Sequence, residues 1–258
     1  MKSLKHSLLI LLAFVQWTVV TAQDKEKWEP KFKKTKNYSK SYSFSGSDKL
    51  VLNNQFGEMK LVTWDKNEVK LDATITGKSD DEQRAQEILD RISINDSKDG
   101  STVSFQTKFA DNKKDWNEKD RKEGRHEGME INYTVYLPAG ANLKAENQFG
   151  KMIVPELKGD VTLVSKFGSL NAGRLSNPRS VTVEFGKADI AYLNGGDLTI
   201  KFSQGKLDQS AGNLDVNVEF SQVKLDIGNE TKGLTIHNSY STLYLDLDKN
   251  LSASYDIV

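Results

Sequence analysis

An aromatic residue followed by a small residue recurs at an almost constant interval through the second half of the chain. From Phe149 onward each aromatic residue of this series precedes Gly or Ser, and neighbouring members are separated by nearly the same stretch of chain. The tetrapeptide Asn-Gln-Phe-Gly occurs both at Asn54–Gly57 and at Asn147–Gly150. A fixed short period predicts a repeat architecture. The repeated aromatic residues are Phe56, Phe149, Phe167, Phe185, Phe202, Phe220 and Tyr240.

Aliphatic residues alternate with polar ones on both sides of each aromatic residue. One set lies four positions before it, and another lies three positions after it. Examples are Leu163, Val181, Leu198, Val216 and Ile236 before it, and Leu170, Val223 and Leu243 after it. Strict alternation predicts half-buried strands with one face in the core. The phase of the alternation changes just after the aromatic residue, which predicts a corner where Gly or Ser tolerates unusual dihedral angles.

A unit of about 18 residues cannot bury its own apolar face, so we expect the units to stack about 4.8 Å apart. The expected fold is all-β: a right-handed, single-stranded parallel β-helix, or β-solenoid, with the aromatic residues in an internal structural column. An antiparallel sandwich or barrel of short strands is the competing interpretation. That alternative gives no reason for a fixed aromatic register.

Residues 1–22 have the pattern of a signal peptide. Lys2 and Lys5 precede the apolar run Leu8–Val15, and the small residues before Gln23 predict cleavage after Ala22. The alternative is a membrane anchor, but the apolar run is short for a span of about 20 residues. We therefore expect export to the periplasm, the outer surface or the medium, with no transmembrane segment after the signal is removed.

The remaining chain divides into a polar linker with a first strand at 23–48 and a solenoid domain at 49–258. An insertion at 78–137 interrupts the solenoid. Within it, Ser79–Glu82 predicts a capping box for a helix whose apolar face covers the N-terminal end of the stack. That face comprises Ala85, Ile88, Leu89 and Ile92. A hairpin around Asp99-Gly100, a charged solvated loop containing Trp116 and a strand at 129–137 are expected to follow.

The segment 54–65, Asn-Gln-Phe-Gly-Glu-Met-Lys-Leu-Val-Thr-Trp-Asp, is followed by Val69-Lys70-Leu71 and the capped helix. This opening resembles that of a bacterial putative-adhesin family of unknown function, which is related to the head GIN domains. The resemblance covers residues 45–258. It implies a β-helix at the cell envelope, and it offers no catalytic residue that could be transferred to this chain.

Composition excludes several common chemistries. The 258 residues include 36 basic and 36 acidic side chains and no cysteine. This balance argues against nucleic-acid binding, and the absence of cysteine excludes disulfides and thiolate metal sites. A triad of His237, Ser239 and a nearby aspartate is conceivable, but no Gly-x-Ser-x-Gly elbow accompanies it. The sequence has no standard metal or phosphate motif, so we predict no catalytic residue, metal or cofactor.

Asp208, Asp226 and Asp246 each lie six positions after a repeated aromatic residue, on the outward face. Stacked carboxylates could bind calcium or act on a polysaccharide. Lys206 and Lys224, two positions earlier on the same face, favour a soluble surface of cross-strand ion pairs instead. The three aspartates therefore remain candidates for a binding site.

The combined features favour an exported, non-enzymatic protein of the cell envelope or surface. As an adhesin or scaffold it would bind an envelope protein or a glycan along one face of the solenoid. The alternative is a carbohydrate-active β-helix enzyme that uses the outward carboxylates. At the C-terminus, Leu251–Ile257 begins another strand without a closing corner, so an oligomer could form through the end of the solenoid.

Overall fold

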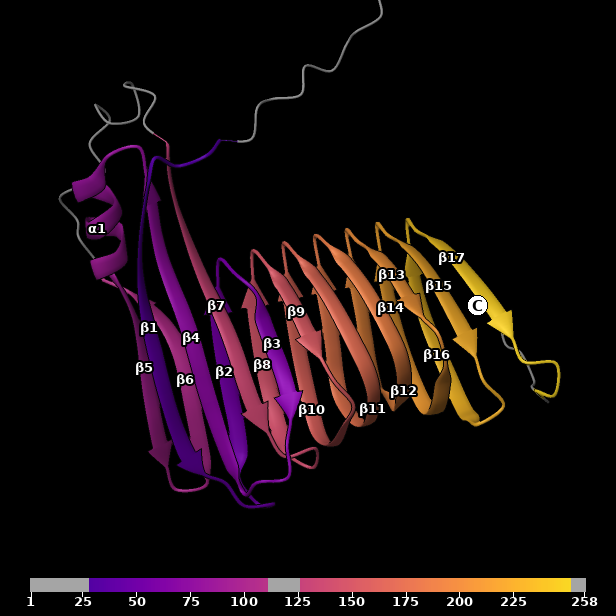
Figure 1. The fold of residues 1–258 in the computed structure, drawn as a ribbon. Coiled ribbons are helices and arrows are strands. Elements are labelled where there is room, and N and C mark those ends of the chain that lie inside the picture. The colour runs from indigo at the N-terminus through magenta and orange to yellow at the C-terminus, as the bar shows by residue number, and fades with distance from the viewer. Residues whose placement is uncertain (1–27, 111–125, 252–258) are drawn as a thin grey trace, which may run out of the picture.

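The computed structural model describes residues 28–110 and 126–251, which form seventeen strands and one helix (Figure 1). The predicted signal peptide, most of the charged loop with Trp116, and the C-terminal segment 252–258 lie outside the described residues. The strands belong to one sheet that winds into a stack of coils. The expected all-β solenoid is therefore confirmed.

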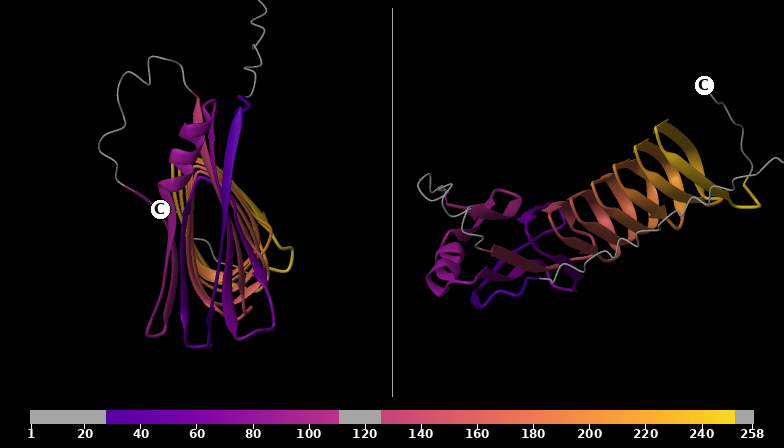
Figure 2. Two further views of the ribbon diagram at one scale, coloured as in Figure 1. Left: turned by 60° about the vertical axis from the view of Figure 1, so that its left-hand side comes forward. Right: turned by 90° about the horizontal axis from the view of Figure 1, so that it is seen from above.

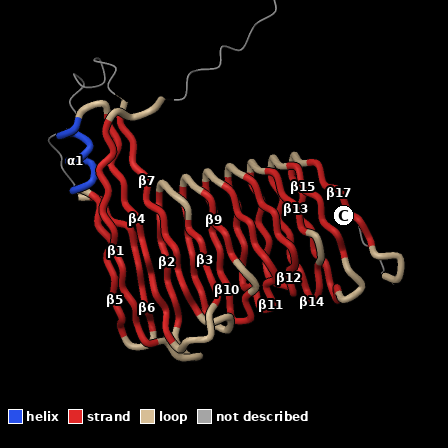
Figure 3. Tube along the Cα trace, viewed as in Figure 1, coloured by secondary structure: helices blue, strands red, loops and turns tan. Residues whose placement is uncertain are grey.

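Aromatic corners separate successive strands at one position in each coil of the stack, and these corners lie along one edge of the molecule (Figure 3). Equivalent strands of successive coils pair in parallel; Leu163 lies opposite Val181, and Val181 lies opposite Leu198. Parallel pairing of the repeat strands excludes the antiparallel sandwich. The strands are β2 (Lys49–Gln55), β3 (Met59–Thr63), β8 (Asn142–Gln148), β9 (Lys151–Val154), β10 (Leu157–Lys166), β11 (Ser169–Glu184), β12 (Lys187–Lys201), β13 (Gln204–Leu207), β14 (Ser210–Glu219), β15 (Gln222–Ile227), β16 (Thr231–Ser239) and β17 (Thr242–Leu247).

The core is a set of aliphatic columns inside the stack. Leu163, Val181, Leu198 and Val216 occupy equivalent positions and are almost completely buried. Burial of each such side chain stabilises the fold by about 1.5–3 kcal/mol. Because every coil contributes the same positions, a small apolar residue set is sufficient for a continuous core.

The N-terminal end of the stack is covered by a cap in which the strands run antiparallel (Figure 2). In the cap, β1 pairs with β4, β4 with β7, and β5 with β6. β6 and β7 then pair in parallel with β2 and β3 of the first coil. The expected hairpin at Asp99-Gly100 and the strand ending at Leu137 are both present. The cap strands are β1 (Phe32–Ser43), β4 (Glu68–Ser79), β5 (Ile92–Asp99), β6 (Thr102–Phe109) and β7 (Glu127–Leu137).

Helix α1 (Glu82–Asp90) packs on β4 and β1 through Ala85, Ile88 and Leu89. The predicted capping box is wrong, because the N-cap is Asp81, whose carboxylate accepts from the Arg84 backbone N–H at 2.8 Å. Ser79 cannot fill this role because it is the last residue of β4 and is buried. Its hydroxyl instead accepts from the backbone N–H of Asp81.

Two tyrosines of β1 bind one carboxylate of β5, and so they join the β1–β4 strand pair to the β5–β6 strand pair of the cap. The Tyr38 hydroxyl donates to Asp96 at 2.5 Å, and Tyr42 donates to its other oxygen. The pKa of Tyr38 is raised mainly by burial and next by the contact with Asp96. The pKa of Tyr42 is raised to about 12, mainly by the Asp96 hydrogen bond and next by burial. Burial acts to raise the pKa of Asp96, but both tyrosine hydrogen bonds and the Lys40 charge outweigh it, so this pKa is lowered.

The lowered pKa of Asp96 predicts a loss of stability in acid. A carboxyl group with a depressed folded-state pKa contributes stability above its unfolded pKa and loses it as the pH falls through the folded value. The ordinary pKa of an aspartate is 3.8. As the pH is lowered below this value, we expect the melting temperature of the native chain to fall more steeply than that of the Asp96→Asn variant. Thermal melts from about pH 6 to about pH 2.5 measure this difference. Asp99→Asn, at the exposed end of the same strand, is the control, and equal slopes for the native and D96N chains would contradict the expectation.

Candidate binding surface along an aromatic ladder

The repeated aromatic rings lie on the outside of the solenoid, so the expected internal location is wrong. Phe149 is 45% exposed, Phe220 is 52% exposed and Tyr240 is 85% exposed. The physical reason is the backbone: all seven aromatic residues have a positive φ, between 47° and 62°. This left-handed conformation turns the side chain outward at the position where strict alternation would have directed it into the core.

The seven rings form one continuous stack, which we call the aromatic ladder: Phe56, Phe149, Phe167, Phe185, Phe202, Phe220 and Tyr240. Neighbouring ring centroids are 4.8–5.1 Å apart, and neighbouring ring planes are within 8° of parallel. At the N-terminal end, Phe109 meets Phe56 edge-on at 5.9 Å. Each internal ring therefore covers the faces of its neighbours, and what it presents to solvent is its edge.

A left-handed conformation is costly for a bulky residue, at about 1–3 kcal/mol per position. Glycine and asparagine adopt it more readily. Ring stacking recovers about 0.5–1.5 kcal/mol per pair beyond area burial. If the only requirement at the corner were a change in chain direction, asparagine would satisfy it at a lower conformational cost. The repeated phenylalanine therefore indicates a requirement for the ring itself.

The glycines that follow the first four rings serve close packing of the coils. A Cβ at Gly168 would lie 1.9 Å from the Gly150 carbonyl oxygen, and one at Gly150 would lie 1.9 Å from the Gly57 oxygen. None of these glycines has a positive φ, so the expectation that the small residue takes the unusual dihedral is wrong. The aromatic residue takes it instead.

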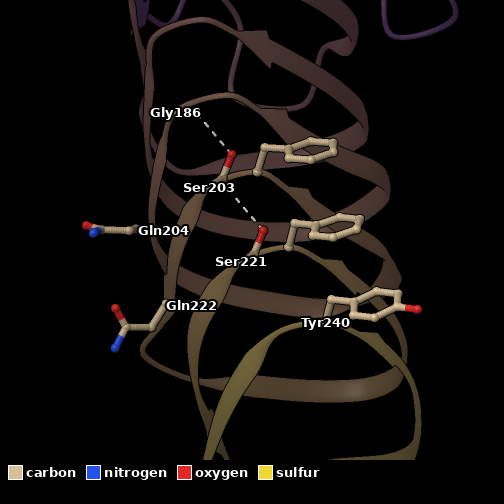
Figure 4. Close-up of a pocket in the computed structure, with 8 residues that line it drawn as sticks. Gly186, Ser203, Gln204, Ser221, Gln222 and Tyr240 are labelled. Atoms are coloured by element: carbon tan, nitrogen blue, oxygen red, sulfur yellow. Dashed lines mark hydrogen bonds between the residues drawn. The ribbon is translucent and has the colours of Figure 1, made fainter.

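In the last three coils serine replaces this glycine and makes its own hydrogen bonds. The Ser203 hydroxyl accepts from the Gly186 backbone N–H at 3.0 Å and donates to the Lys201 carbonyl at 2.6 Å. Ser221 repeats this arrangement with the N–H of Ser203 (Figure 4). The hydroxyls thus form a second ladder beside the rings.

The asparagines of the repeated tetrapeptide lie inside the first two corners. The Asn54 side-chain amide donates to the Ile131 carbonyl at 2.9 Å and to Asn147 Oδ1 at 3.1 Å. Thr107 donates to Asn54 Oδ1 at 2.8 Å and also contacts the Tyr133 hydroxyl. The side chains of both asparagines, Thr107 and Tyr133 are buried. The network joins the cap to the first two coils, a role that the sequence pattern did not predict.

Polar ladders flank the rings on both sides. The residues just before the rings pair with one another, Lys166 with Glu184 at 3.1 Å and Lys201 with Glu219 at 3.1 Å. On the other side a shallow hollow of about 570 Å³ runs past the last rings. It is lined by Gly186, Phe202, Ser203, Gln204, Phe220, Ser221, Gln222 and Tyr240 (Figure 4).

The three outward aspartates lie together on another face, each with a lysine close by. Lys206 contacts Asp208 at 2.5 Å, and Lys224 lies 3.0 Å from Asp226 and 3.6 Å from Asp246. The hydrogen bonds to these aspartates raise the pKa of both lysines. A hollow of about 500 Å³ beside the carboxylates is open to solvent. In residues 28–110 and 126–251, no cluster of three or more acidic or histidine side chains could hold a metal ion.

The conceivable triad does not form among the described residues. His237 lies on the exposed face of β16 opposite Asn217, and no hydrogen bond within the described part of the chain joins it to Ser239 or to a carboxylate. The other described histidine, His126, stacks on Trp28 at 5.6 Å and lies 3.8 Å from Asp80. Over the same described ranges, no helix has the length and apolar character needed to cross a bilayer.

No family model and no curated protein matches this chain. It is similar to the structure of a putative cell adhesion protein from Clostridium sporogenes, with 11% identity and a TM-score of 0.33, covering 83% of this chain and 100% of that one. It is also similar to the structure of a putative adhesin from Bacteroides fragilis, with 14% identity and a TM-score of 0.27. A putative adhesin from Parabacteroides distasonis matches with 12% identity and a TM-score of 0.28. Each of these two matches covers 83% of this chain and 97% of the matched chain. All three are structures of bacterial proteins named for adhesion.

Proposed function

We propose that this chain is an exported, non-enzymatic protein of the cell envelope or cell surface, an adhesin or scaffold that binds a macromolecular partner. The proposed contact surface is the aromatic ladder with its polar flanks. The observation that carries the proposal is the continuous exposure of stacked rings, each close to half exposed from Phe149 to Phe220. Contiguous apolar surface of this kind on a soluble protein marks an interaction site.

The shape of the ladder favours an extended partner. At the usual strand spacing of about 4.8 Å, seven coils present a stripe about 30 Å long. Ion pairs along one flank, such as Lys166 with Glu184, neutralise the charges beside the rings. A surface with aromatic residues at the centre and a polar rim is typical of protein interfaces. A protein or glycan of the envelope, lying along the stack, would satisfy both features.

The export pattern of residues 1–22 supports the proposed location. The lysine contacts of Asp208, Asp226 and Asp246 support a role for these residues in a soluble surface. Because each carboxylate lies beside a lysine and the hollow next to them is open to solvent, we prefer a binding role to the carbohydrate-active alternative.

Replacing three rings by asparagine tests the proposal without breaking the corners. Asparagine suits a positive φ, so the variant F167N/F185N/F202N is expected to fold. Binding of the purified protein to envelope fractions and to an immobilised glycan panel should weaken at least about 10-fold, because loss of central aromatic contacts dominates interface energetics. Surface plasmon resonance of the retained component measures the change.

The matched control places three asparagines on the carboxylate face of the solenoid: D189N/K206N/K224N. This control should bind as the native chain does. The proposal is wrong if the native protein retains no envelope component, or if the ring variant binds as tightly as the control. Cleavage of a glycan by the native chain, abolished in Asp226→Asn, would instead establish the enzyme alternative.

A further inference from the structure

The ring edges beside the serine corners form a regular array that has its own binding chemistry. The rings are parallel to one another within 8°, and neighbouring centroids are about 5 Å apart, so the rings present their edges in a row along the stack. The face of a flat molecule that lies along this row therefore meets several ring edges at once. Aromatic pairs favour this edge-to-face geometry, since the positive ring edge attracts the negative face of another π system.

The hollow beside the last three rings exposes several ring edges in a row. The ring centroids of Phe202 and Phe220 are 5.1 Å apart, and those of Phe220 and Tyr240 are 5.0 Å apart. The hollow therefore passes the edges of three consecutive, closely spaced rings. Its lining behind the rings consists of the small residues Gly186 and Ser203, together with Ser221. Small side chains leave room for a flat ligand to approach several ring edges at once.

The border of the hollow is polar but uncharged. Gln204 and Gln222 lie beyond the serines, and their side chains point away from the rings (Figure 4). Within the described part of the chain their side-chain amides make no hydrogen bond, whereas Ser203 and Ser221 already satisfy theirs. The two amides are thus available to polar atoms at the outer rim of a ligand.

We propose that this hollow binds an elongated, planar aromatic molecule of two or more linked rings. Its long axis would lie along the solenoid, its face would lie against the edges of Phe202, Phe220 and Tyr240, and its polar atoms would face Gln204 and Gln222. These three rings also belong to the proposed partner surface, but binding of the flat molecule does not depend on that function. It requires only the purified chain.

The neutral dye 2-(4-dimethylaminophenyl)benzothiazole, a planar molecule of two linked ring systems whose fluorescence rises in apolar surroundings, is the probe. Titration of the native chain should give a saturable rise in fluorescence with one dye per protein. The variant F202N/F220N should weaken binding at least about 10-fold, because it removes two of three edge-to-face contacts while asparagine preserves the corner conformation. Circular dichroism verifies that the variant keeps its β structure.

The matched control is F149N/F167N, which removes two rings from the glycine coils and should bind the dye like the native chain. Gln222→Ala is a second test, and it leaves the core intact because Gln222 is exposed. It should weaken binding several-fold, because the dye loses an amide that can donate to its nitrogen. The inference is overturned if the native chain gives no saturable signal, if F202N/F220N or Q222A binds normally, or if F149N/F167N loses binding equally. A failed search for macromolecular partners would leave these results unchanged.

Discussion

Substitution of Gly168 by alanine is expected to destabilise the chain by at least about 3 kcal/mol, at the upper end of overpacking effects. The added Cβ would lie 1.9 Å from the Gly150 carbonyl oxygen, which is backbone rather than a movable side chain. Both neighbouring coils are held in place, because the Ser169 N–H donates to the Gly150 oxygen and the Lys187 N–H donates to the Gly168 oxygen. Relief of the overlap would therefore separate two coils.

Urea unfolding followed by circular dichroism measures this loss as a lower midpoint at an unchanged slope. Gly140→Ala is the matched control, since a Cβ there meets no atom within 4 Å and its φ is not in the left-handed region. The control should change stability by less than about 0.5 kcal/mol. An equal midpoint for G168A and G140A would show that the coils can separate without cost and would refute this packing explanation.

Asn54→Ala is expected to cost on the order of 3–5 kcal/mol, because each buried polar group left unpaired costs about 1–3 kcal/mol. The substitution removes the partner of Thr107, of the Ile131 carbonyl and of Asn147 at once. Because the network joins the cap to the first two coils, we also expect faster amide hydrogen exchange in β6 and β7 than in β12 and β14.

Gln55→Ala is the control for this second experiment. Gln55 is the next residue on the same strand and its side chain points to the other face, where it is only half-buried. A loss of more than about 1 kcal/mol in Q55A, or of less than that in N54A, would contradict the assigned role of the network. Hydrogen exchange then distinguishes local opening of the cap from global unfolding.

The position of the aromatic rings shows why part of the site could not be predicted. Alternation of aliphatic residues correctly identified the buried columns, such as Leu163, Val181 and Leu198. The same rule directs the rings inward, because it assumes extended backbone on both sides of a position. One residue in the left-handed conformation reverses the direction of its side chain. The local sequence predicts a corner just after Phe167, but it assigns the unusual dihedral to Gly168 and not to Phe167.

The corner glycines and the helix cap illustrate the same difficulty. The local pattern assigns an unusual dihedral to Gly168, yet the requirement for glycine comes from the carbonyl of Gly150, which belongs to the preceding coil. The serine that the pattern assigns to the cap of α1 is held in β4, so Asp81 caps the helix. In each case the deciding atom or strand lies outside the local pattern from which the prediction was made.

The period of the coils, the inward columns, the corners and the covered N-terminal end could all be predicted before any coordinates were known. These features depend on the spacing of apolar residues along one chain, and that spacing is visible in the sequence. The alignment of the rings in one column was also predicted, but their outward direction and the hollow along their edges became known only from the folded stack. The outward direction depends on a left-handed backbone at each ring, and the hollow forms only where ring edges of neighbouring coils lie about 5 Å apart, which no single repeat can encode.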